Sequence, residues 1–256
     1  MKAIILAAGM ASRLRPLTDT MPKCLLKVGE RSLLQRSIDA LCDNGIRQFV
    51  FVTGYRHEMI EDFVTSRYPH LDATFIYNEA YSSTNNIYSL WLARPEADGE
   101  EVLLLDSDLL YDPHILGRVI SAEGSNILTL IRHDLGEEEM KVVIDDAGHI
   151  TAISKKCNPE EAIGESLGIE RMSAAYTTAL YRELDSMMNP GHHNDGQGEE
   201  EGAEDLRNVF YERAFERLIP QGHTFSVVDV SDLFSCELDT VSDFNEAKKL
   251  IPPHLY

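Results

Sequence analysis

Short apolar runs alternate with amphipathic segments through the first 120 residues of the chain, and this alternation restricts the fold more than any other feature. The apolar runs predict buried strands over residues 2–7, 49–53, 73–77 and 101–106. Apolar side chains at helical spacing predict helices over residues 32–44, 56–68 and 86–93. This order favours a doubly wound α/β fold with a mostly parallel sheet, which binds ligands at the carboxyl ends of its strands.

The second half of the chain is more irregular, and we expect the sheet to become mixed there. Predicted strands cover residues 126–131, 141–144, 149–153, 173–180 and 224–230, and the second and third of them form a hairpin. One helix is predicted over 204–218, and another begins at Val241, where Thr240 and Asp243 match a capping box. Residues 188–203 are rich in Gly, Asn and Glu and lack periodicity, which predicts a mobile acidic loop.

The chain carries a net charge of −20 and has a pI near 4.7. A chain of this charge repels nucleic acid and anionic membranes unless it holds a local basic patch, so we expect neither as a partner. No stretch approaches the roughly 20 apolar residues that span a bilayer, and the N-terminal apolar run is too short for a signal peptide. We therefore expect a cytoplasmic protein. The four cysteines form no CxxC pair and are expected to be reduced thiols.

A basic loop follows the first predicted strand. Residues 1–60 hold nine Lys or Arg against five Asp or Glu, a net charge of +4 within an acidic chain, which suggests a local anion site. At Gly9 the backbone can approach a ligand closely, so its N–H groups can cradle phosphate oxygens, and Arg13 and Lys23 add full positive charges. The loop contains no Walker A motif. The alternative interpretation is a surface loop with incidental basic residues.

Two pairs of acidic residues follow predicted strands. Asp106 and Asp108 form one pair, and Glu237 and Asp239 form the other. On an extended strand this spacing points both carboxylates of a pair to one face. Acids brought together in this way bind a hard divalent cation such as Mg²⁺ through oxygen. The alternative is that these acids form turns or cap helices.

Two segments carry a resemblance to a known family. Residues 6–18 read LAAGMASRLRPLT and are followed by Pro22 and Lys23, and residues 85–90 read NNIYSL. They resemble the signatures of the nucleotidyltransferase family with a GT-A-like Rossmann fold, in its bacterial phosphocholine cytidylyltransferase-like branch. The resemblance covers residues 1–120 and resumes over 234–250. Ala11 stands where the family usually has Gly, and Leu109 stands where some relatives have Asn.

The resemblance implies a role for each matching position. Arg13, Lys23 and Asp108 would be catalytic: Arg13 would hold the β- and γ-phosphates, and Lys23 would bridge the α-phosphate and the incoming phosphate. Asp108 and Asp239 would bind the metal, with Glu237 as a further ligand. The nucleotide would lie along Leu6, Ala7, Ala8, Gly9, Asn78, Asn85, Ser89 and Asp106. From the residues alone, one of Asn85 and Asn86 has an N-cap of the following helix as its alternative role.

Fewer sequence features indicate which residues form the acceptor site. Lys155 and Lys156 follow a predicted strand near the place where sugar-nucleotide relatives hold the acceptor's phosphate, and a solvated pair is the alternative. Phe210 and Tyr211 are candidates for an acceptor wall. A quaternary ammonium calls for an aromatic box, whereas the single tryptophan, Trp91, fits a helix core. A primary amine needs carboxylates more than aromatic rings, so the thin aromatic content of this half favours a small aminoalkyl phosphate or phosphonate, or a relative of phosphocholine.

We therefore expect a Mg²⁺-dependent cytidylyltransferase that transfers CMP from CTP to such a small anionic acceptor and releases pyrophosphate. The acceptor is already an anion, so catalysis rests on positioning and charge neutralisation without a general base. Residues 1–256 would form one domain, with a nucleotide-binding half over 1–120 and an acceptor-binding half over 121–256. A sugar-1-phosphate nucleotidyltransferase and a non-catalytic nucleotide-binding protein of the same fold remain as alternatives, and a homo-oligomer remains open.

Overall fold

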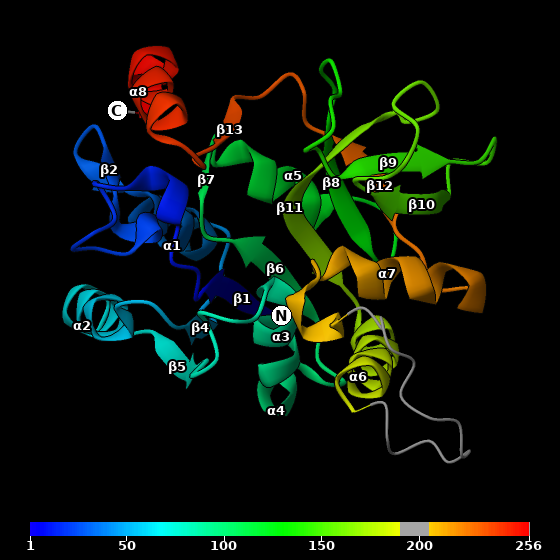
Figure 1. Cartoon of the computed structure of the whole chain (residues 1–256), viewed down its shortest axis with the longest axis horizontal. Helices are drawn as coiled ribbons and strands as arrows, with labels where there is room; N and C mark the ends of the chain where they lie inside the picture. Colours follow the sequence, from blue (N-terminus) through cyan, green and yellow to red (C-terminus); the bar gives the residue numbers. More distant parts are fainter. Residues whose placement is uncertain (190–204, 256) are drawn as a thin grey trace.

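A mixed nine-stranded sheet runs through the centre of the computed structural model, which describes residues 1–189 and 205–255 (Figure 1). Its N-terminal part is parallel, in the order β6-β1-β4-β5. These strands are β1 (Lys2–Ala7), β4 (Gln48–Thr53), β5 (Asp72–Tyr77) and β6 (Val102–Asp106). The expected α/β fold with a doubly wound sheet is confirmed.

The second half of the sheet is mainly antiparallel and is organised around one long strand, β11 (Gly164–Met172). β11 pairs antiparallel with β6, β8 and β9, and β12 joins the outer side of β8 in parallel. β9 and β10 form the predicted hairpin. The strands around β11 are β8 (Ile127–Ile131), β9 (Lys141–Ile144), β10 (Ile150–Ser154) and β12 (Ser226–Asp229).

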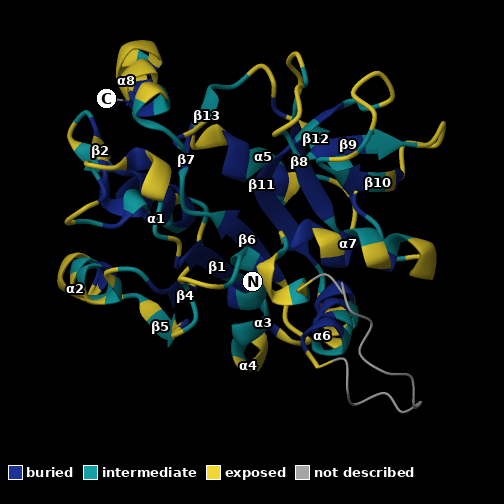
Figure 2. Ribbon diagram, in the orientation of Figure 1, coloured by how far each residue is buried: buried dark blue, intermediate teal, exposed yellow. Residues whose placement is uncertain are grey.

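Helices cover both faces of the sheet, and β1 shows why this arrangement is stable. Alternate side chains of β1 enter two different hydrophobic clusters: Ile4 and Leu6 enter one, and Ile5 and Ala7 enter the other. Buried residues of α3 (Asn86–Leu92), α4 (Arg94–Ala97), α6 (Ala174–Met188) and α7 (Glu212–Leu218) belong to the first cluster. Those of α2 (His57–Arg67) and α5 (His114–Ser121), and most of those of α1 (Leu33–Asp43), belong to the second. Figure 2 accordingly shows β1, β6 and β11 as buried.

A third, smaller cluster ties the C-terminal helix to the N-terminal loop. Helix α8 (Val241–Leu250) contributes Phe244 and Ala247, which pack with Leu14 and Val28. Val28 belongs to a short antiparallel ribbon formed by β2 (Lys27–Val28) and β3 (Arg31–Ser32). The C-terminal helix α8 therefore packs against the loop that follows β1 and the β2–β3 ribbon.

A second short ribbon brings the two acidic pairs together. β7 (Leu109–Tyr111) pairs antiparallel with β13 (Ser235–Glu237), so Leu109 lies opposite Glu237. The backbone N–H of Leu238 donates to the carbonyl oxygen of Asp108, 3.1 Å away. This ribbon therefore fixes the position of the late acids against Asp108.

Two predicted elements are wrong. Residues 173–180 were expected as a strand but begin α6, because Ser173 caps a helix whose Tyr176, Leu180 and Leu184 recur at four-residue spacing on its buried face. The helix expected over 204–218 is only α7, preceded by a single 3-10 turn at Leu206–Asn208. Residues 190–203 of the expected acidic loop lie outside the described residues.

Two further findings concern the whole described chain. All four cysteines are free thiols. Within residues 1–189 and 205–255, no helix combines the length and the apolar character that crossing a membrane requires.

Candidate active site

An open cavity of about 280 Å³ lies at the carboxyl ends of β1 and β6. The structure brings fourteen of the sixteen predicted site residues to its walls. From the nucleotide-binding half these are Leu6, Ala7, Ala8, Gly9, Arg13, Lys23, Asn78, Asn85, Ser89, Asp106 and Asp108. From the second half they are Lys155, Glu237 and Asp239. Lys156 and Tyr211 do not line the cavity.

The loop after β1 holds its shape through one residue in an unusual conformation. Ala11 has a left-handed backbone with φ 46° and ψ 51°, which places it where glycine is the residue without steric cost. The hydroxyl of Thr18 donates to the carbonyl oxygen of Ala11 at 2.9 Å, and Leu14 is fully buried beneath the loop. The structure thus accommodates alanine in a backbone conformation that favours glycine.

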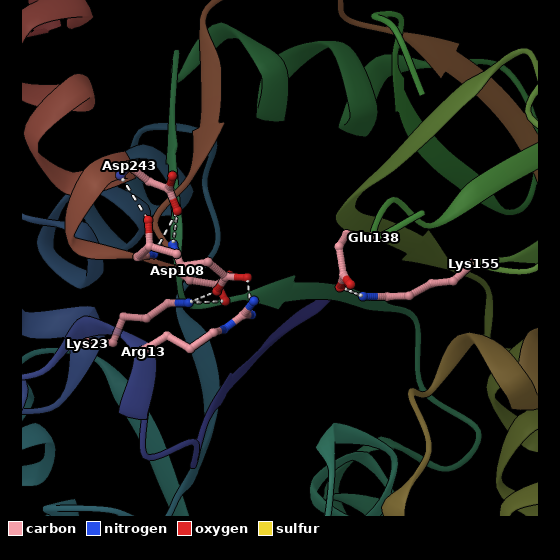
Figure 3. Close-up of polar contacts among 8 residues, drawn as sticks. Arg13, Lys23, Asp108, Glu138, Lys155 and Asp243 are labelled. Atoms are coloured by element: carbon pink, nitrogen blue, oxygen red, sulfur yellow. Dashed lines mark hydrogen bonds and ion pairs between the residues drawn. The ribbon is translucent and has the colours of Figure 1, made fainter. Parts of the chain in front are cut away.

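Lys23 lies between two carboxylates. Its Nζ is 2.9 Å from Oδ2 of Asp108 and 2.6 Å from Oδ1 of Asp239 (Figure 3). Burial lowers the pKa of Lys23, but the two neighbouring carboxylates outweigh burial and raise the pKa above its ordinary value. Arg13 donates to the other oxygen of Asp239 at 2.6 Å and is otherwise largely exposed. Residues far apart in the sequence thus form one charged cluster.

The acids of this cluster hold more negative charge than Lys23 compensates. Loss of hydration within the site, together with the charges of Asp108 and Asp239, raises the pKa of Glu237 to about 8, although the residue as a whole is exposed. Burial also raises the pKa of Asp239, but Lys23 and Arg13 outweigh it and leave the pKa lowered. Oδ1 of Asp108 is buried and has no hydrogen-bond partner among residues 1–189 and 205–255. No group of three or more His, Cys, Asp or Glu in the described part of the chain is already arranged to hold a metal ion.

Asp106 and Asp108 do not act as a pair on one strand face. β6 ends at Asp106, so the chain turns between the two acids and gives them different partners. The hydroxyl of Tyr211 donates to Oδ2 of Asp106 at 3.1 Å, whereas Asp108 pairs with Lys23. Burial and the charge of Asp108 raise the pKa of Asp106. Gly168 on β11 faces Asp106 closely: a Cβ at this position would lie 2.7 Å from Oδ2 of Asp106, and the φ of +78° also favours glycine.

A polar network holds the segment between β5 and α3. The side-chain amide of Asn78 donates to the hydroxyls of Ser89 and Thr84, at 3.1 and 3.3 Å, and its Oδ1 accepts from the N–H of Ala80. Asn85 caps α3, because its side chain accepts from the N–H of the next residue. The helix-cap alternative therefore holds for Asn85. The network fixes one wall of the cavity.

The acceptor side of the cavity differs from the expectation in two places. Tyr211 is fully buried, because its hydroxyl turns inward to Asp106 and Glu170, whereas its neighbour Phe210 is 40% exposed and lines the cavity. The expectation that Tyr211 forms an acceptor wall is therefore wrong. Of the two lysines, Lys155 lines the cavity and Lys156 is exposed away from it.

Lys155 lies across the cavity from Arg13 and Lys23 (Figure 3). Its Nζ is 3.5 Å from Oε2 of Glu138 and 4.5 Å from the centre of the Phe210 ring. Sequence reasoning missed Glu212, which lines the cavity from the start of α7. Burial raises the pKa of Glu212 to about 7, while the charge of Lys155 opposes that shift.

Comparisons with known proteins add to this geometry. Residues 2–178 match the family model described as nucleotidyl transferase. The chain is 37% identical to the choline-phosphate cytidylyltransferase of Streptococcus pneumoniae over 109 residues, which are 43% of this chain and 46% of that protein. It is 27% identical to the CMP-5'-(3-aminopropyl)phosphonate synthase of Streptomyces rubellomurinus over 265 residues, which are 98% of this chain and 39% of that protein. The matched segments thus span less than half the length of both relatives.

One solved structure matches almost the whole fold. The CTP:phosphocholine cytidylyltransferase from Streptococcus pneumoniae superposes with a TM-score of 0.76 over 98% of this chain and 99% of that chain. The sequence identity in this superposition is 20%, so the match shows a shared fold.

Proposed function

Because this chain belongs to the nucleotidyl transferase family, we propose that it is a CTP-dependent cytidylyltransferase. The proposed reaction transfers CMP from CTP to a small phosphorylated or phosphonate amino alcohol and releases pyrophosphate. The names of the two curated relatives support cytidine as the base, since one is a cytidylyltransferase and the other a synthase of a CMP conjugate. The same names support choline phosphate or an aminoalkyl phosphonate as the class of acceptor.

The observation that carries this proposal is the convergence of Arg13, Lys23, Asp108 and Asp239 at one end of the cavity. In the proposed reaction an acceptor oxygen attacks the α-phosphorus of CTP, a new P–O bond forms, and the bond to the β-phosphate oxygen breaks. Negative charge then gathers on the leaving pyrophosphate. Fixed cations close to that charge stabilise the transition state, and the acceptor needs no base because it is already ionised.

Different side chains of this protein would carry out different parts of the proposed reaction. Arg13 is exposed at the mouth of the cavity, where it would neutralise the leaving β- and γ-phosphates. Lys23, held in its charged form by two carboxylates, would contact the α-phosphate and the attacking oxygen. Lys155 would orient the acceptor's anionic group from the opposite side of the cavity. In this proposal, residues 1–120 mainly bind the nucleotide and residues 121–256 mainly bind the acceptor.

The carboxylates fit a magnesium ion by their chemistry. Two observations support this fit: Oδ1 of Asp108 is buried without a hydrogen-bond partner among the described residues, and the charges of Asp108 and Asp239 help to raise the pKa of Glu237, a repulsion that a small divalent cation would relieve. Asp108, Glu237 and Asp239 would hold Mg²⁺, which supplies charge neutralisation for the triphosphate. Lys23 lies between Asp108 and Asp239 in the structure. Lys23 would therefore have to move toward the substrate phosphates before these acids could hold Mg²⁺.

A panel of substrates tests the proposal. Pyrophosphate release is measured with CTP, UTP, dTTP, ATP and GTP, each with Mg²⁺ and with 2-aminoethylphosphonate, phosphocholine or glucose 1-phosphate. We expect release with CTP and one of the first two acceptors. Release only with glucose 1-phosphate would show a sugar-1-phosphate nucleotidyltransferase instead. Binding of CTP without any release would show a nucleotide-binding protein.

The variant Asp108→Asn tests the proposed role of Asp108 in the same assay. We expect kcat/KM to fall by at least about 100-fold, because the variant removes a charged oxygen ligand while it keeps the shape of the side chain. Asp62→Asn, an exposed change on α2, serves as the control and should match the unmodified protein. Near-normal turnover by Asp108→Asn would contradict the assignment.

A further inference from the structure

Glu212 is a buried carboxylate that lines the cavity outside the cluster around Lys23. It is only 6% exposed, and its Oε2 has no hydrogen-bond partner among the described residues. A buried carboxylate oxygen without a partner is costly, because it has lost water and gained no donor. In a cavity that admits a ligand, this oxygen is therefore a place where a hydrogen-bonding cation would be stabilised.

The carboxyl groups behind Glu212 are already engaged. The hydroxyl of Tyr211 donates to Asp106 at 3.1 Å and lies 3.4 Å from Oε2 of Glu170. The hydroxyl of Ser166 bonds the other oxygen of Glu170, at 3.3 Å. Of Asp106, Glu170 and Glu212, only Glu212 has a fully buried carboxylate oxygen without a hydrogen-bond partner among the described residues, and it lines the cavity.

Lys155 lines the same cavity as Glu212 and the charged cluster around Lys23. Its ammonium is near enough to act on the carboxylates of both Glu212 and Asp239. The cavity wall thus presents the cations of Arg13, Lys23 and Lys155, the last paired with Glu138, together with the buried carboxylate of Glu212. Cations and a carboxylate oxygen without a partner in one cavity suit a ligand that carries both an anionic group and a cationic group.

Resting on the function proposed above, we propose that Glu212 binds the protonated amine of the acceptor and selects an ammonium that carries N–H groups over a quaternary one. The phosphate or phosphonate of this zwitterion lies toward Lys155 and Lys23. An N–H group can donate to the unpartnered oxygen of Glu212, whereas a trimethylammonium group has no hydrogen to donate.

The aromatic lining supports the same selection. Within residues 1–189 and 205–255, only Tyr81 and Phe210 contribute aromatic rings to the cavity wall. The ring of Phe210 already has the ammonium of Lys155 4.5 Å from its centre. A quaternary ammonium is recognised by several free aromatic faces, and this wall does not present them.

Three acceptors that differ only at the amine test the proposal. They are 2-aminoethylphosphonate, its N,N,N-trimethyl analogue and ethylphosphonate, each assayed for pyrophosphate release with CTP and Mg²⁺. We expect kcat/KM for 2-aminoethylphosphonate to exceed that of both analogues by at least about tenfold, the value of one charge-assisted hydrogen bond. An equal or higher kcat/KM for either analogue would overturn the proposal.

Variants on α7 assign the selection to Glu212. Glu212→Gln should lower kcat/KM for 2-aminoethylphosphonate by roughly tenfold to 100-fold, mainly through KM, and leave the KM for CTP and the turnover of ethylphosphonate unchanged. Glu212→Asp keeps the charge and should retain part of the preference for the amine. Glu216→Gln is the control: Glu216 lies one turn further along α7, pairs with Arg213 and does not line the cavity. Equal behaviour of Glu212→Gln and Glu216→Gln would overturn the proposal.

A binding measurement separates this proposal from the proposed function. If none of the three acceptors releases pyrophosphate, cytidylyl transfer to this class is wrong. Calorimetric binding of 2-aminoethylphosphonate to the same folded variants then decides the role of Glu212 by itself. Binding that Glu212→Gln weakens and Glu216→Gln does not would support the role, and binding that is absent or insensitive to Glu212→Gln would overturn it.

Discussion

Lys23 is the residue that balances the charge of the cavity. Its ammonium contacts Asp108 and Asp239, and its side chain is only 12% exposed. Removing one partner of a buried ion pair leaves the other charge uncompensated, which costs about 3 kcal/mol of stability. Lys23→Met should therefore lower the free energy of unfolding in EDTA by about this amount, and Mg²⁺ should restore part of the loss because it replaces the missing cation.

Turnover of Lys23→Met should fall at least about 100-fold even when Mg²⁺ restores stability, because the substrate phosphates lose a fixed charge. Urea unfolding with and without Mg²⁺, together with pyrophosphate release, measures both effects. Lys27→Met, a change at an exposed lysine of β2, is the control. A Lys23→Met protein with unchanged stability in EDTA would contradict this account of the charge balance.

Single residues also show how far the sequence predicts the site. Arg13 and Lys23 stand in a loop of recognisable composition, so their convergence in the cavity could be expected. The position of Glu212 in the cavity could not be expected, since a single acid at the start of a short helix forms no motif with other residues. Phe210 and Tyr211 are adjacent aromatic residues, and only the packing of α7 decides that Phe210 lines the cavity and that Tyr211 is buried.

At the scale of elements, local signals predicted the parallel half of the sheet and missed its antiparallel centre. β11 contains the buried charged residues Glu170 and Arg171. Charged residues within a segment favour the prediction of a loop rather than a buried strand. The two Nη atoms of Arg171 donate to the carbonyl oxygens of Ile120, Ala122 and Gly124, and Glu170 accepts from Ser166. These partners come from other elements, so tertiary contacts rather than periodicity make this segment a strand.

The predicted cap of α8 also positions a site residue. The hydroxyl of Thr240 accepts from the N–H of Asp243, and the Asp243 carboxylate accepts from the N–H groups of Thr240 and Asp239. Thr240→Ala should lower the free energy of unfolding by about 1 kcal/mol, as is usual for a lost N-cap. Because Asp239 lies next to the cap, turnover should also fall severalfold.

Ser173→Ala provides the matched control for this prediction. Ser173 caps α6 by accepting from the N–H of Tyr176, and it does not line the cavity. Ser173→Ala should lower the free energy of unfolding by a similar amount and leave turnover unchanged. Urea unfolding and pyrophosphate release on both variants make the comparison, and equal turnover in the two variants would show that the cap of α8 does not position Asp239.

At the scale of the whole molecule, the C-terminal segment closes the fold against its first third. Arg36 of α1 donates to the carbonyl oxygen of Leu255, and its other Nη donates to the carbonyl oxygen of Val28 at 2.6 Å. Nε2 of His254 is 3.2 Å from Oδ2 of Asp112, which follows β7. These contacts join α1, β2 and the residue after β7 to the 3-10 turn Pro253–Leu255 that follows α8.

The ionised form of Asp112 should make this closure sensitive to acid. Burial raises the pKa of Asp112, but the backbone N–H and ring of His114 and the ring of His254 outweigh it and leave the pKa lowered. A carboxyl whose pKa is lower in the folded state stabilises the fold above the pKa of an unfolded aspartate, about 3.9, and loses that contribution as the pH falls through the folded pKa. Asp112→Asn should therefore be less stable than the unmodified protein by about 1–2 kcal/mol at pH 6, and this difference should shrink between pH 4 and pH 3. Urea unfolding across this range measures it, with the exposed Asp146→Asn as control. A difference that stays constant down to pH 3 would show that the charge of Asp112 does not hold the C-terminal segment against the residues that follow β7.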